Sequence, residues 1–217
     1  NFLLFCCLIL LEYVILWKVN MNTNRMIELL NRLVPEEGVI EDTIEKVDIF
    51  RITSSSPRTA QSYSPGIIIL AQGQKRIFIG DEYFVYDPLN YLVLSVPLPL
   101  ECETTASAEK PLLGLKIKTD AKTVGEILLS LDSTHQDYKS LPKGIYSAPL
   151  DGQMTDAAVR LLETLSSPAD SRFLGPMIVR EIIYRVLCGE KGDVLRALAY
   201  RNQRYFHCNP NQWWNTF

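Results

Sequence analysis

The sequence predicts an α+β fold, in which a small β-barrel or jelly roll is followed by helices. Residues 66–106 consist of short apolar runs that end at turn signals, at Gly73, at Gly80-Asp81 and at Asp87-Pro88. Short strands with such frequent turns are typical of small barrels. From about residue 121 the apolar period changes from two residues to 3.6, which indicates helices. The strands therefore come first in the chain and the helices after them.

The chain before the barrel predicts one helix and one strand. Thr23 or Asn24 can cap a helix that runs to about Val34, and Pro35 ends it. Apolar and polar residues alternate at 47–52, which suits a strand. Loops are expected at two polar stretches, 36–48 and 54–58.

Glycine and proline residues bound the predicted barrel strands. Gly73 offers a positive φ angle, and Gly80-Asp81 suits a two-residue hairpin turn. Pro97 and Pro99 exclude a central strand at that point, because proline cannot donate a ladder hydrogen bond. The predicted strands lie at 66–71, 75–79, 83–86, 91–95, 100–105 and 112–118.

Helices are predicted after the barrel. Asp151 is expected to cap a helix over 151–166. Gly189 stands where a second helix, over 171–187, would end. Two shorter helices are expected, one with Val124, Ile127, Leu128 and Leu131 on its apolar side and one at 193–200.

Composition restricts the class of protein. The chain has 217 residues, of which 47% are apolar, so it can fill a core of one domain with an appendage. A net charge of −3 argues against nucleic-acid binding by this chain, because such domains are usually basic. Five cysteines without metal-ligand spacing or a disulfide framework fit a reducing compartment, and the expected location is the cytoplasm.

The N-terminal residues 1–20 are predicted to be an apolar extension of the domain. Residues 2–17 are apolar except for Glu12, and this run is marginal in length for a membrane span. It lacks the features of a secretory signal. Three interpretations stay open: upstream sequence before a true start at Met21, a membrane or interfacial anchor, and a helix that packs on the domain or a partner.

The sequence offers little for metal or nucleophilic chemistry. The two histidines, His135 and His207, lie outside the predicted strands, so no metal site is expected. Neither a nucleophile motif nor a dinucleotide or phosphate-binding glycine pattern is present, so we expect no catalytic residue and no cofactor. Cys102 stands between Glu101 and Glu103, and its expected role is that of a small core residue.

Binding without chemistry remains as the function of a barrel. The candidate ligand-binding residues are polar groups on or beside otherwise apolar strands. For each of them an ordinary structural role is the alternative, namely packing at the edge of the core or contact with solvent; Lys75-Arg76 in particular is expected to be an exposed strand end. The candidates are Arg58, Tyr63, Gln72, Tyr86 and Tyr91.

The helix over 151–166 has one broad apolar face, with residues at spacings i, i+3, i+4, i+7, i+8 and i+11. Such a face packs either on the barrel of the same chain or on a partner subunit. If it forms a homodimer, Leu161, Leu162 and Leu165 are the expected contact residues.

Several segments together resemble a known family. They include AQGQKRIFIGDEYFVYDPLNYLVLSVPLPLECET (71–104), with AQG, GD, YDP and SVPLP elements in that order, and EKPLLGLKIKTD (109–120). RLVPEEGVIE (32–41), YSAPLDGQMTDAAVRLLETLSSPAD (146–170) and GPMIVREIIYRVLCGEKGDVLRALA (175–199) extend the match from near Met26 to near Arg204. This pattern is similar to the N-terminal domain of AraC-type bacterial transcriptional regulators.

The resemblance implies a cupin-like sensor barrel at 21–145 and a helical dimerisation region at 146–200. It implies a small-molecule effector, whose identity the sequence does not give, and a homodimer. The tail at 201–217 stands where the family's DNA-binding domain would begin, and it is too short for a helix-turn-helix unit. DNA binding is therefore expected only through a domain that this sequence lacks. The alternatives are a metal-free cupin-like enzyme and a membrane-anchored small-molecule binding module.

Overall fold

Two antiparallel sheets form the centre of the molecule. The computed structural model describes residues 20–44, 46–131, 144–190 and 192–207. One sheet has six strands, in the order β1 (Gly38–Ile44), β2 (Val47–Ile52), β9 (Leu112–Lys118), β4 (Gly66–Gln72), β7 (Asn90–Leu94) and β10 (Ile145–Pro149). The other has four, in the order β3 (Ser56–Tyr63), β8 (Leu98–Thr105), β5 (Gln74–Ile79) and β6 (Glu82–Tyr86).

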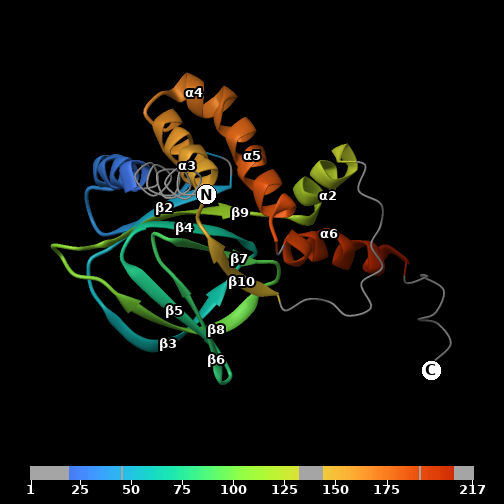
Figure 1. The fold of residues 1–217 in the computed structure, drawn as a ribbon, viewed down its shortest axis with the longest axis horizontal. Helices are drawn as coiled ribbons and strands as arrows, with labels where there is room; N and C mark the ends of the chain where they lie inside the picture. The colour runs from blue at the N-terminus through green and yellow to red at the C-terminus, as the bar shows by residue number, and fades with distance from the viewer. Residues whose placement is uncertain (1–19, 45, 132–143, 191, 208–217) are drawn as a thin grey trace, which may run out of the picture.

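The helices lie on one side of the six-stranded sheet, and the four-stranded sheet lies on the other (Figure 1). A first helix covers residues 20–33. The others are α2 (Ala121–Ser130), α3 (Gly152–Thr164), α4 (Pro168–Phe173), α5 (Gly175–Cys188) and α6 (Gly192–His207). The result is three layers, with the six-stranded sheet in the middle.

The middle sheet is buried on both faces. In β4, Ile67 and Ile69 belong to the core shared with the helices, whereas Ile68 and Leu70 belong to the core between the two sheets. Successive residues of a strand point to opposite faces, so a continuous apolar run is what such a strand requires. The run at 66–71 therefore serves two cores at once.

Gly114 allows close packing in the centre of β9. It pairs with Phe50 of β2 on one side and with Leu70 of β4 on the other. A Cβ atom at this position would lie 2.7 Å from the Ile69 carbonyl oxygen and 2.7 Å from Cζ of Phe50. The glycine thus makes room for the Phe50 ring between the sheets.

Most predicted elements of the barrel and the helices are confirmed. The strands predicted at 47–52 and 112–118 match β2 and β9 residue for residue. Gly73 and Gly80 have φ angles of +86° and +59°, as turns require. Asp151 caps α3, and its carboxylate accepts a hydrogen bond from the Met154 amide at 2.7 Å.

Three strands that the sequence analysis assigned to loops or left out are present. These are β1, β3 and β10. β1 pairs only with β2, at the edge of the sheet, and residues 38–42 are exposed. Because neither face of this edge strand is fully buried, its sequence shows no apolar alternation. β3 likewise exposes most of its residues and pairs only with β8.

Two helix predictions were wrong in their boundaries. The first helix already includes residue 20, so Thr23 and Asn24 lie inside it and do not cap it. The helix predicted over 171–187 is two helices, α4 and α5, which meet at Leu174. Pro176 follows in the first turn of α5, where its missing N–H has no cost.

Pro99 of β8 lies where the sequence analysis allowed it, and Pro97 precedes the strand. Pro99 pairs with Ser62 of β3, whereas β8 pairs with β5 only over residues 101–105. The strand therefore has a neighbour on one side only at this point, and no ladder hydrogen bond to β5 is lost.

Residues 1–19 and 208–217, on which the predictions of an N-terminal extension and a C-terminal tail depend, lie outside the described residues. None of the helices in the described part of the chain is long and apolar enough to cross a membrane.

We expect Gly114→Ala to lower the free energy of unfolding by about 1–3 kcal/mol, the usual cost of overpacking a core. The backbone carbonyl of Ile69 cannot move away without disturbing the β4–β9 ladder. Gly125→Ala in α2 is the matched control, because a Cβ atom there meets nothing within 4 Å. The control should be stabilised by about 0.5–1 kcal/mol through helix propensity. Urea denaturation of both variants measures the difference, and equal effects would contradict it.

Candidate ligand-binding site

A cavity of about 220 Å³ lies between the two sheets. It is formed by side chains from seven strands, so the register of both sheets sets its shape. Val39 is 58% exposed and lies at its mouth. The lining residues are Val39, Asp48, Phe50, Ile52, Tyr63, Ile68, Lys75, Tyr86 and Lys116.

A hydrogen-bonded polar cluster forms part of the wall of this cavity. Nζ of Lys75 donates a hydrogen bond to the Tyr63 hydroxyl at 3.0 Å. The hydroxyls of Tyr63 and Tyr86 are 3.4 Å apart. Lys75 is only 7% exposed and Tyr86 only 1%. An ammonium group and two phenols are thus held together away from solvent.

Burial shifts the pKa values of these groups toward their neutral forms. It raises the pKa of the Tyr63 and Tyr86 phenols above their ordinary value, and it lowers the pKa of the Lys75 ammonium. Burial also raises the pKa of the Cys102 thiol, which is fully buried beside this cluster. The phenols and the thiol therefore stay protonated at neutral pH.

A second lysine reaches the cavity from β9. Nζ of Lys116 donates to the Ser64 hydroxyl at 2.8 Å, and burial lowers its pKa. The carboxylate of the lining residue Asp48 is already engaged, because it pairs with Lys118 at 2.8 Å and accepts from the Asp42 amide at 3.0 Å.

Tyr63 and Tyr86 are the two predicted ligand-binding residues that line the cavity. Arg58 does not line it. On β3, Arg58 has the same parity as the exposed residues Ala60 and Ser62. Its Nε donates to the Glu101 carboxylate at 2.6 Å, and its guanidinium lies 4.3 Å from the centre of the Phe78 ring.

Gln72 and Tyr91 also lie away from the cavity. The Gln72 amide donates to the Pro111 carbonyl oxygen at 2.8 Å and joins the ends of β4 and β9. Tyr91 lies on the helix side of β7 and packs edge-on against Tyr146, with ring centres 6.3 Å apart. The structure thus gives both residues a packing role.

The two lysines of the cavity were missed by the sequence analysis. Lys75 was expected to be an exposed strand end, and this was wrong because its side chain is buried. The alternation of β5 contains the signal, since Lys75 has the parity of the buried Ile77 and Arg76 has the parity of Phe78. On β9, Lys116 points to the same face of the sheet as Gly114, because the two are separated by one residue.

Leu161 and Leu162 are fully buried inside the chain. The apolar face of α3 packs on the six-stranded sheet and on α5, so these side chains are not exposed to a partner; Leu165 is half-buried at the edge of the same core. Of the two packing modes that the sequence left open, this is packing within the same chain. The physical reason is that the apolar side chains on the helix-facing side of the middle sheet must be buried.

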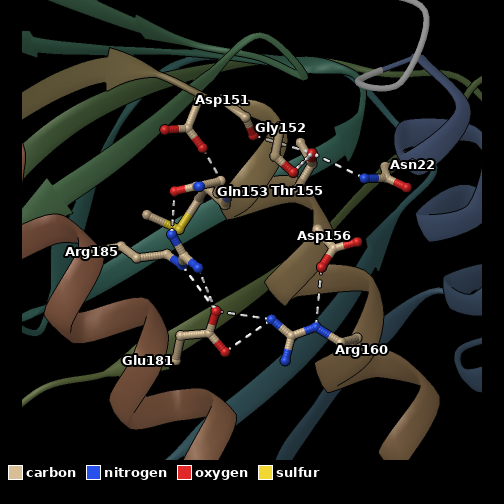
Figure 2. A network of polar contacts seen from close by, with 10 residues as sticks. Asn22, Asp151, Gly152, Gln153, Thr155, Asp156, Arg160, Glu181 and Arg185 are labelled. Carbon is tan, nitrogen blue, oxygen red and sulfur yellow. Dashed lines mark hydrogen bonds and ion pairs between the residues drawn. The ribbon is translucent and has the colours of Figure 1, made fainter. Parts of the chain in front are cut away.

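A polar network joins α3 to α5 (Figure 2). Arg160 of α3 donates two hydrogen bonds of 2.9 Å to the Glu181 carboxylate of α5, and Asp156 also accepts from its Nε. Arg185 donates to Glu181 at 2.7 Å and to the Gln153 side chain at 2.6 Å. Bidentate pairing of this kind fixes the orientation of the two helices.

The outward side of α4 and α5 carries large apolar residues that are exposed among the residues that the structure describes. Phe173 is 72% exposed, Met177 67% and Tyr184 43%. Met177 lies between two grooves, one of about 530 Å³ against α3 and one of about 320 Å³ against α2. Among the described residues, no group of three or more metal-ligating side chains lies together.

No curated protein sequence matches the chain. Two structures of ToxT from Vibrio cholerae strain SCE256 have a distant likeness to this chain, which spans less than two thirds of the length of each. An apo variant has a TM-score of 0.46 and 9% identity over 65% of this chain and 55% of its own. The wild type with a bound unsaturated fatty acid has a TM-score of 0.42 and 7% identity over 78% of this chain and 65% of its own.

Membership of a family is shown by the sequence itself. The family model described as AraC-type transcriptional regulator N-terminus matches residues 43–194. That range runs from the end of β1 through both sheets to the start of α6, so it contains every residue that lines the cavity except Val39. The chain therefore belongs to the AraC-type transcriptional regulator N-terminal family.

Proposed function

We propose that the cavity between the sheets is the site at which this domain binds its small-molecule effector. The observation that carries the proposal is the cluster of buried Lys75 and Tyr86 with half-buried Tyr63, beside the apolar lining residues Phe50, Ile52 and Ile68. Ligand sites are usually apolar cavities with a few fixed polar groups. Within the family the chain serves as a cytoplasmic regulator, and DNA is bound by a separate domain of the full-length protein.

Binding rather than catalysis is supported by the protonation states of the cavity. The phenols and the Cys102 thiol are held protonated by burial, so neither offers a nucleophile at neutral pH. The lining has one carboxylate, Asp48, and it is neutralised by Lys118. We therefore propose that the domain is not an enzyme.

A homodimer is proposed to form through the outward face of α4 and α5. The apolar face of α3 is used inside the chain, whereas Phe173, Met177 and Tyr184 remain uncovered. Cations and anions alternate beside them, with Arg180 and Glu181 adjacent in sequence and Arg180 paired to Glu126 at 3.3 Å. A patch of mixed charge is self-complementary, as a two-fold interface requires.

The effector proposal is tested by filling the cavity. Ile68→Phe adds volume at a lining position that is 3% exposed. We expect ligand-observed NMR on a panel of neutral, cationic and anionic fragments to detect binding to the wild type and to lose it with this variant, at a stability cost of about 1–3 kcal/mol. Ile69→Phe, which faces the helices, is the matched control and should keep the binding. Loss of the same fragments in both variants, or no bound fragment at all, would contradict the proposal.

Lys75 is expected to be retained for binding at the expense of stability. Lys75→Met replaces a desolvated ammonium with an apolar side chain of similar length, and should raise the free energy of unfolding by about 1 kcal/mol or more. The Tyr63 hydroxyl keeps Gln61 and Tyr86 as partners. Thermal and urea denaturation at pH 7 measure the change, and a destabilised variant would show that the lysine is structural.

The same comparison has a defined pH dependence. The pKa of Lys75 is lower in the folded chain than its ordinary value of 10.5, so between these two values the unfolded chain binds more protons. Stability rises with pH wherever that holds. The advantage of Lys75→Met over the wild type should therefore shrink as the pH approaches 10.5.

The dimer proposal is tested with Met177→Glu. Placing a charge at the centre of an apolar contact costs several kcal/mol, so the variant should be a folded monomer. Leu89→Glu is the control, because Leu89 is 63% exposed at the β6–β7 turn, away from α5. Analytical ultracentrifugation with circular dichroism distinguishes the two. An unchanged association state for both variants would place the contact elsewhere.

A further inference from the structure

The cavity contains more positive charge than the chain neutralises. Nζ of Lys75 and Nζ of Lys116 lie 5.6 and 6.0 Å from the centre of the same Tyr63 ring. Their hydrogen-bond partners are hydroxyls, of Tyr63 and Ser64. Among the described residues, neither ammonium group is within ion-pair distance of a carboxylate. Two cations thus lie near one aromatic ring in the wall of the cavity.

The charged form of both lysines is disfavoured by their surroundings. Burial is the main cause that lowers the pKa of each lysine, which means that the surroundings oppose the charged form. The nearest lining carboxylate, Asp48, is paired with Lys118 and is not free to turn toward them. Lys116 is half-buried and Asp48 partly favours its charged form, so the uncompensated buried charge is that of Lys75. Ionisable groups that are shifted by burial cluster at functional sites.

The other lining residues and the volume of the cavity restrict the polarity and size of the rest of the ligand. Phe50, Ile52 and Ile68 are apolar, and the ring faces of Tyr63 and Tyr86 add aromatic surface. The volume of about 220 Å³ lies below the range of roughly 300–1,000 Å³ that is usual for pockets of drug-sized ligands. The body of the ligand is therefore compact, and a single ring or a short branched chain suits it.

We propose that the effector is a compact monocarboxylate with an apolar body. Its carboxylate lies between Lys75 and Lys116 at Tyr63, and its body lies against Phe50, Ile52 and Ile68. This inference rests on the proposed function of the cavity. A carboxylate brings one negative charge and an apolar remainder, whereas inorganic phosphate brings more charge and nothing to fill the apolar part.

Benzoate and benzamide are the probes, because they have the same ring and differ in charge. In calorimetric titrations of the full chain at pH 7, benzoate should bind at least about tenfold more tightly than benzamide, as expected for hydrogen bonds to a charged group. Lys75→Met should remove that preference and leave benzamide binding unchanged or improved. Lys122→Met, an exposed lysine of α2, removes the same charge elsewhere and should leave both affinities within about twofold of the wild type.

Each alternative result overturns the inference in a recognisable way. Equal binding of benzoate and benzamide, or a benzoate affinity that survives Lys75→Met, would show that the lysines do not recognise the ligand. Displacement of benzoate by equimolar inorganic phosphate would show an anion site without the apolar body. If only neutral or cationic fragments bind in the cavity, the carboxylate proposal fails while the effector site stands. If no fragment of any charge binds, the proposed function itself fails.

Discussion

The burial of the six-stranded sheet on both faces is the constraint on which the rest of the structure depends. In its central strands, β4 and β9, alternate residues pack against the helices on one side and against the second sheet on the other. The backbone groups of these strands are paired in continuous ladders, so the apolar side chains need no further polar partner. Gly114 lets the Phe50 ring pack between the sheets without breaking those ladders, and Phe50 in turn lines the cavity.

This arrangement explains how the domain tolerates a buried cation. Two apolar cores supply the stability, and the strands that carry Lys75 and Lys116 are fixed by ladders on both sides. The free-energy cost of burying a lysine at the cavity wall is therefore offset by the stability that the two cores supply. Sites that bind ligands are commonly less than optimally stable for this reason.

The central part of the fold could be predicted from the sequence, whereas the edges could not. The run at 66–71 and the turns at Gly73 and Gly80 have strong local signals, because a doubly buried strand must be apolar and a positive φ favours glycine. Edge strands β1 and β3 are exposed and lack such signals.

Tyr63 and Tyr86 could be found as polar groups on apolar strands, but Lys75 could not be separated from a solvated lysine without knowing which face of β5 is inward. Leu161 and Leu162 show the same limit, since an apolar helix face does not reveal which surface covers it.

Strand β7 is shared between the two cores through consecutive residues. Tyr91 contributes to the core under the helices, and Leu92 contributes to the core that encloses the cavity. β7 also contacts α6, the last helix of the described chain. Because successive residues of a strand point to opposite faces, a displacement of β7 would alter the packing on both sides of the middle sheet.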